Sequence, residues 1–124
     1  MKVYLICSSY YCGDDGFINY TLCPKEKIYT SKDSALRAAR KICNANMEYF
    51  LYSNSKNRKE VEEIFKETDT YRGQTLEALM LYYDLWEASI RERWSKTIRI
   101  ITPDDIKRLN YDRDEIFVLE TDCE

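Results

Sequence analysis

Residues 75–94 constrain the fold most, because they carry the strongest helical pattern in the chain. Apolar side chains recur there at spacings of three and four, as on the buried stripe of an amphipathic helix: Leu76, Leu79, Met80, Tyr83, Trp86, Ile90 and Trp94. A second apolar set lies outside this stripe: Leu81, Tyr82, Leu85 and Ala88. Because the combined arc is wider than one buried face, it predicts either a central helix covered on two sides or an exposed surface that binds a partner.

The N-terminal pattern is that of a β-hairpin. Residues 2–9 alternate with apolar side chains on both faces, which is typical of an inner strand. Gly13 and Gly16 then bracket two aspartates and provide the backbone freedom of a connecting loop. We expect a return strand over residues 17–23 that is interrupted at Pro24 and resumes over 27–29, since proline cannot donate to a ladder.

Two further helices are expected before residues 75–94. Thr30 provides a capping hydroxyl, and an apolar stripe follows it to about residue 52. Residues 53–57 are rich in serine and asparagine, which compete for backbone hydrogen bonds, so they predict a loop. A shorter helix is expected over about residues 58–68.

The last quarter of the chain returns to β-structure. Residues 97–101 and 115–120 are short and rich in β-branched or aromatic side chains. Between them, Thr102 and Pro103 have the pattern of a helix start, which predicts one helical turn over 106–109. The predicted fold class is therefore α+β: an N-terminal β-hairpin, a helical middle of two to three helices, and a C-terminal strand pair completing one mainly antiparallel sheet. A chain of 124 residues fits one domain, which we assign to 1–124.

The composition argues against familiar enzyme chemistry. The chain contains no histidine, which removes the commonest general base and the usual activator of a serine or cysteine nucleophile. Asp14 with Asp15, and Asp104 with Asp105, are each explained by a turn or a helix start. The loop between the two glycines lacks the pattern of a phosphate-binding loop. We therefore predict a protein that is not an enzyme and has no cofactor.

The cysteines and the hydropathy predict a cytoplasmic protein. Five cysteines, an odd number with no paired spacing, indicate reduced thiols and no metal site: Cys7, Cys12, Cys23, Cys43 and Cys123. No apolar run approaches the roughly 20 residues that span a bilayer, so no membrane partner is expected. Nor does the start of the chain have the pattern of a secretion signal.

Charge favours no partner class by itself. A net charge of −3 gives no overall attraction to nucleic acid, whose binding depends on phosphate neutralisation. Arg37, Arg40 and Lys41 nevertheless share one face of the first predicted helix, where they would bind phosphates or an acidic protein surface. Direct nucleic-acid binding is the less favoured of these two interpretations.

Tyrosine is the best compositional argument for a protein-binding surface. The chain has 11 tyrosines, and this side chain gives a large contact area with a polar tip. Two of them, Tyr10 and Tyr11, flank the predicted hairpin loop that contains Asp14 and Asp15. The predicted partner-binding residues are Tyr10, Tyr11, Asp14, Asp15, Arg37, Arg40, Lys41, Tyr82 and Leu85.

One segment resembles a known class of proteins. Residues 28–36, Ile-Tyr-Thr-Ser-Lys-Asp-Ser-Ala-Leu, follow the predicted hairpin and resemble a strand-to-helix module of small phage and prophage accessory proteins. The resemblance covers about the first 50 residues and contains no catalytic motif. Many proteins of this class, anti-CRISPR proteins among them, bind and block a host machine.

The resemblance implies a non-enzymatic protein-binding module. We expect a phage-encoded inhibitor that acts in the host cytoplasm on a bacterial defence or regulatory complex, with a host protein or ribonucleoprotein as its partner. Self-association into a homo-oligomer stays open. The alternative is a small protein that binds RNA or a nucleotide-like ligand through its basic helix faces.

Overall fold

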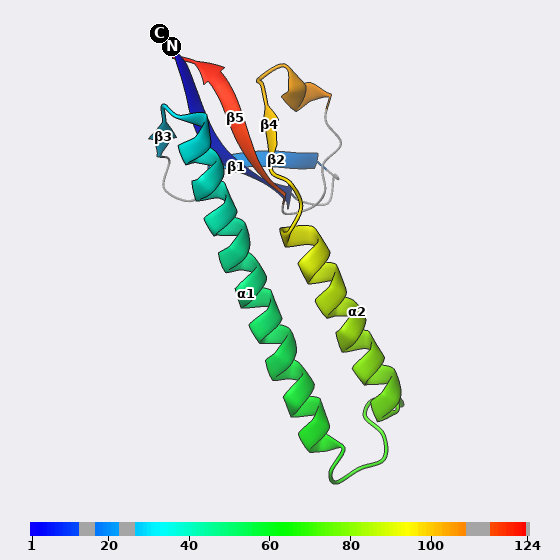
Figure 1. Cartoon of the computed structure of the whole chain (residues 1–124). Helices are drawn as coiled ribbons and strands as arrows, with labels where there is room; N and C mark the ends of the chain where they lie inside the picture. The colour runs from blue at the N-terminus through cyan, green and yellow to red at the C-terminus, as the bar shows by residue number, and fades with distance from the viewer. Residues whose placement is uncertain (13–16, 23–26, 109–114, 124) are drawn as a thin grey trace. The chain divides into compact units, whose positions relative to one another are not determined.

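The computed structural model describes residues 1–12, 17–22, 27–108 and 115–123, and in this part of the chain it forms two helices and a mixed, open sheet (Figure 1). The α+β class is therefore confirmed. The chain divides into two compact units, which we call the sheet unit (Met1–Cys43 and Thr97–Glu124) and the helical unit (Asn44–Lys96). Assignment of the whole chain to one domain stays a prediction.

The sheet brings the two ends of the chain together. Its strands are β1 (Lys2–Cys12), β2 (Phe17–Leu22), β3 (Ile28–Tyr29), β4 (Arg99–Ile101) and β5 (Ile116–Asp122), with the order β2-β1-β5-β4. β1 pairs antiparallel with β2, β3 and β5, whereas β4 pairs parallel with β5. The C-terminal strands thus complete one sheet as predicted, but their own pairing is parallel.

The N-terminal strands pair as a hairpin, although not with the predicted bounds. β1 continues to Cys12, beyond the predicted end at Ser9, and its last residue pairs with Phe17. β5 occupies one edge of β1, so β2 and β3 share the other edge. Residues 23–27 separate β2 from β3, whereas Ile6 alone separates their partners on β1. The predicted interruption at Pro24 lies outside the described residues.

The core of the sheet unit is built around β1 and β5. Phe117 and Val118 are both 0% exposed. Because successive residues of a strand point to opposite faces, both faces of β5 are covered at this point. The first turns of α1 (Lys32–Ile64) contribute a buried stripe of small side chains at a spacing of four: Ala35, Ala39 and Cys43.

The predicted loop at 53–57 and the separate helix after it are wrong, because α1 is continuous from Lys32 to Ile64. This segment has no glycine or proline, so nothing in it forbids helical backbone. Asn54 does not bond its own backbone, but donates from Nδ2 across to the carbonyl oxygen of Tyr83 at 3.1 Å. Tertiary packing thus overrides the weak helix propensity of serine and asparagine.

The helical unit pairs the second part of α1 with α2 (Leu76–Trp94), whose bounds agree with the predicted helix. The Thr75 hydroxyl caps α2 by accepting a hydrogen bond from the Ala78 amide at 3.3 Å. Before this cap, Tyr71 and Gln74 form an isolated antiparallel bridge around Arg72 and Gly73, both with positive φ. Positive φ at both central residues is the geometry of a tight type I′ turn, and it suits Gly73 better than Arg72.

The short helix before β5 also differs from the prediction. A 3₁₀ turn covers Asp105–Lys107, whereas a helical turn is expected over 106–109, of which residue 109 lies outside the described residues. The Thr102 carbonyl oxygen accepts from the Asp105 amide at 3.0 Å. Thr102 also donates from its backbone amide and its hydroxyl to one carboxylate oxygen of Asp105, at 2.9 and 3.0 Å. These hydrogen bonds hold the pKa of Asp105 below its usual value.

Candidate functional site

The two helices of the helical unit are antiparallel and joined by specific contacts on their facing sides (Figure 1). The ring of Phe50 stacks on Trp94, with centroids 5.9 Å apart and planes 10° apart. Asn54 bonds the Tyr83 carbonyl, and the Arg58 guanidinium meets the Asp84 carboxylate at 2.6 Å. α2 therefore buries its Tyr83, Ile90 and Trp94 side in this unit.

The opposite side of α2 is apolar and exposed. Leu81, Tyr82 and Leu85 are 59%, 58% and 63% exposed, and they lie on one face at helical spacing with exposed Ala78 and Ala88. We call these five residues the α2 outer face. The Tyr82 ring packs edge-on against the Tyr83 ring, with centroids 5.4 Å apart. This contact restricts the orientation of the Tyr82 ring before any partner binds.

Charged residues follow one flank of the α2 outer face. Glu77 lies in the first turn of α2, Asp84 is next to Leu85, and Arg91 lies in the last turn. Asp84 is held by Arg58 from α1, and Arg91 is held by Glu87 at 3.0 Å. The flank is thus acidic at its N-terminal end and basic at its C-terminal end.

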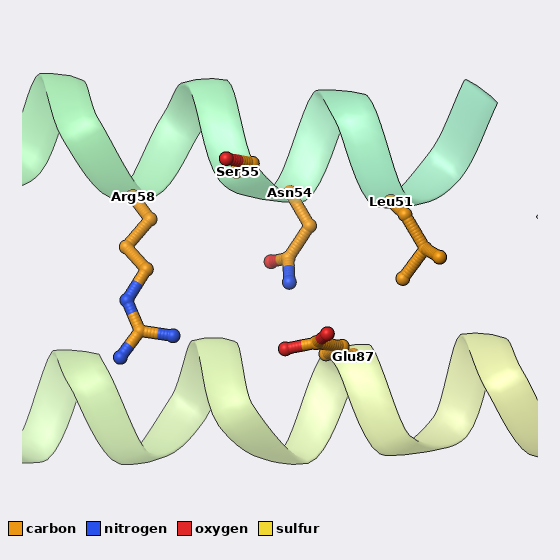
Figure 2. Close-up of a pocket in the computed structure, with 5 residues that line it drawn as sticks. All are labelled: Leu51, Asn54, Ser55, Arg58 and Glu87. Carbon is orange, nitrogen blue, oxygen red and sulfur yellow. The ribbon is translucent and has the colours of Figure 1, made fainter. Parts of the chain in front are cut away.

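A polar cavity of about 130 Å³ opens between the helices beside the Arg58–Asp84 pair. Figure 2 shows Leu51, Asn54, Ser55 and Arg58 on α1, with Glu87 across from them on α2. The carboxamide oxygen of Asn54 is buried and has no hydrogen-bond partner among the described residues. The volume and the polar lining suit a few water molecules, one of which would donate to this oxygen.

The cavity charges are engaged in ion pairs, Arg58 with Asp84 and Glu87 with Arg91. Burial raises the pKa of the Tyr83 phenol, so this hydroxyl stays protonated at neutral pH. Across the described ranges, no group of three or more acidic or thiol side chains is arranged to hold a metal ion.

The predicted binding residues fall in different parts of the chain. Tyr82 and Leu85 lie together on the α2 outer face. Arg37, Arg40 and Lys41 lie on the α1 segment of the sheet unit, where Arg37 and Lys41 are exposed and Arg40 is half-buried. Arg37 donates to the Ser34 hydroxyl at 3.3 Å.

Of the predicted hairpin residues, the structure describes the backbone of Tyr10 and Tyr11. Tyr10 and Tyr11 lie in β1, where they pair with Asn19 and Ile18 of β2. Asp14 and Asp15 lie outside the described residues.

Sequence reasoning missed the residues that hold the two helices together. Asn54 falls in a segment whose composition predicts a loop, and neither Arg58 nor Asp84 stands out in the sequence. No local pattern indicates the ion pair of Arg58 with Asp84, because the two residues are far apart in the sequence. Leu81 is part of the wide apolar arc in the sequence, and it lies on the α2 outer face with Tyr82 and Leu85.

The chain matches no known protein-family model, no curated protein and no solved structure. Within the described residues, neither helix has the length and apolar character needed to cross a membrane. The geometry of the α2 outer face is therefore the main basis for a functional argument.

The two sides of α2 should respond differently to truncation. We expect Leu85→Ala to lower the free energy of unfolding by under about 1 kcal/mol in dilute protein, since Leu85 is largely in solvent. The matched change Ile90→Ala should cost about 2–5 kcal/mol, because Ile90 is buried. Urea denaturation of both variants measures the difference. An equal and large loss in both would show that Leu85 is covered within the chain.

Proposed function

We propose that this protein acts by binding another protein through the α2 outer face. The observation that carries the proposal is that Leu81, Tyr82 and Leu85 are each more than half exposed on one side of a helix whose other side is already packed. Leaving three large apolar side chains in water on one face forgoes burial energy that a partner would recover. Tyrosine is also among the side chains that most often carry binding energy in interfaces.

The mode of action that fits this surface is blocking. Neither the helical unit nor the cavity provides a nucleophile with an activating base, so binding itself is the activity we propose. In line with the resemblance of residues 28–36, we assign the protein to the small phage-encoded inhibitors, with a subunit of a bacterial defence or regulatory complex as the target. Arg37 and Lys41 then serve solubility or a secondary contact.

Site-specific crosslinking tests this proposal. A photo-crosslinking amino acid is placed at Tyr82 in protein expressed in bacterial cells that carry CRISPR and restriction systems. We expect one discrete protein adduct, identified by mass spectrometry as a subunit of such a complex. Crosslinking at Tyr52 is the matched control, because this tyrosine is 68% exposed on α1 and lies outside the α2 outer face.

The adduct must depend on the α2 outer face. Leu85→Asp should remove it while the circular dichroism spectrum of the protein stays unchanged. Adducts with RNA in place of protein, or equal adducts from positions 52 and 82, would contradict the proposal. Binding to RNA that weakens steeply with salt would favour the basic residues of α1 instead.

A further inference from the structure

We infer that, in the absence of a target, the α2 outer face binds the α2 outer face of a second copy of this chain, with the two helices antiparallel. The inference rests on the proposed function, because it concerns the same surface and describes its free state. It follows from two features of α2, one steric and one electrostatic, that share a single twofold axis.

The steric feature is a match of large and small side chains. Leu81 and Ala88 lie about two turns apart on the exposed side of α2. A twofold axis halfway between them, between Asp84 and Leu85, places Leu81 of each copy against Ala88 of the other. Alanine leaves room for leucine there, and Leu85, which is 63% exposed, lies next to the axis and meets its own copy. An isologous contact of this kind is the commonest in homodimers.

The electrostatic feature is the order of charges along the flank. Arg91 follows Glu77 by about four turns, so the two lie on nearly the same side of α2. The position halfway between them is Asp84, which is next to the axis that the steric match requires. The same antiparallel arrangement therefore brings Glu77 of each copy to Arg91 of the other. In a parallel arrangement, Glu77 of one copy and Arg91 of the other would lie about four turns apart and would not meet.

The charges already paired within the chain allow this arrangement. Asp84 would face its own copy near the axis, but the Arg58 guanidinium at 2.6 Å offsets its charge. Arg91 donates to Glu87 through Nε and one terminal nitrogen. A guanidinium has five N–H donors, so Arg91 retains donors for Glu77 of the second copy.

Measurement of molar mass tests the dimer directly. We expect light scattering after size exclusion to show a concentration-dependent dimer, with reductant present because Cys123 is exposed. Leu85→Asp should weaken the dimer by about 30-fold or more, the effect of losing a central apolar contact. Glu63→Lys, at an exposed position on α1 outside the α2 outer face, should leave the dissociation constant unchanged.

A charge swap tests the antiparallel arrangement. Glu77→Arg and Arg91→Glu should each weaken the dimer by about 5-fold, and the double variant should recover the original dissociation constant. Both changes also oppose the helix macrodipole, since they put a cation at the N-terminus and an anion at the C-terminus. Loss of helix stability alone would therefore make the double variant worse than either single variant, so recovery is specific to pairing between copies.

The outcomes separate this inference from the proposed function. A monomer at roughly 1 mM, where even a millimolar dissociation constant is detected, overturns the inference and leaves the crosslinking result at Tyr82 unaffected. A dimer that Leu85→Asp does not weaken, or that the double charge swap does not restore, also overturns it. A dimer without any target adduct at Tyr82 supports the inference and contradicts the proposed function.

Discussion

Replacing Phe117 by alanine should lower the free energy of unfolding by about 3–5 kcal/mol, the usual range for a buried phenylalanine with the cavity it leaves. Phe117 is 0% exposed on β5 and pairs with Cys7 of β1 on one side and Arg99 of β4 on the other. Its ring also supports the Arg99 guanidinium, which lies 5.2 Å from the ring centroid. Alanine removes the packing and this cation–π contact together. Urea denaturation followed by far-UV circular dichroism measures the loss.

The control for Phe117 is Ile100→Ala, which truncates an exposed side chain on neighbouring β4. Ile100 is 36% exposed, so we expect a smaller loss than from Phe117→Ala, about 1–2 kcal/mol. The bidentate ion pair of Arg99 with Glu115, at 2.6 and 2.7 Å, does not depend on the phenylalanine ring and should survive. A loss under about 1 kcal/mol in Phe117→Ala would contradict the described pairing of β5 with β1 and β4.

Local patterns predicted the strands better than they predicted the pairing. The apolar content of residues 2–9 and 115–120 correctly indicated strands, because alternation is a property of neighbouring residues. The parallel pairing of β4 with β5 is decided by the path of the chain between them, which no local pattern encodes. The partly buried contact of Ser9 with Glu115, whose amide donates to the Ser9 hydroxyl at 2.9 Å, cannot be predicted for the same reason.

The helices show how tertiary contacts override a local signal. Residues 53–57 have the composition of a loop, but Asn54 and Arg58 both bond α2 and keep the segment helical. The candidate site, in contrast, is indicated by a local sequence pattern. The wide apolar arc of residues 75–94 indicated a second apolar face from the sequence alone, and the exposure of Tyr82 and Leu85 decides in favour of an uncovered surface over internal cover.

Trp94→Ala is expected to have a similarly large effect in the helical unit, about 3–5 kcal/mol. Trp94 is buried near the end of α2 and stacks on Phe50 of α1, so its removal loses both a large apolar area and an aromatic pair. Tyr52→Ala is the matched control, since it truncates an exposed aromatic ring and should cost about 0.5 kcal/mol or less.

Comparison of Trp94→Ala with Phe117→Ala also tests the prediction of a single domain. Because α1 is one continuous helix with its ends in different units, we expect the chain to unfold in one transition. Both variants should then lower the same midpoint, whether unfolding is followed by tryptophan fluorescence, which reports on Trp86 and Trp94, or by circular dichroism. For Trp94→Ala the fluorescence comes from Trp86 alone. Two separated transitions, with each variant shifting only one of them, would show that the sheet unit and the helical unit fold independently.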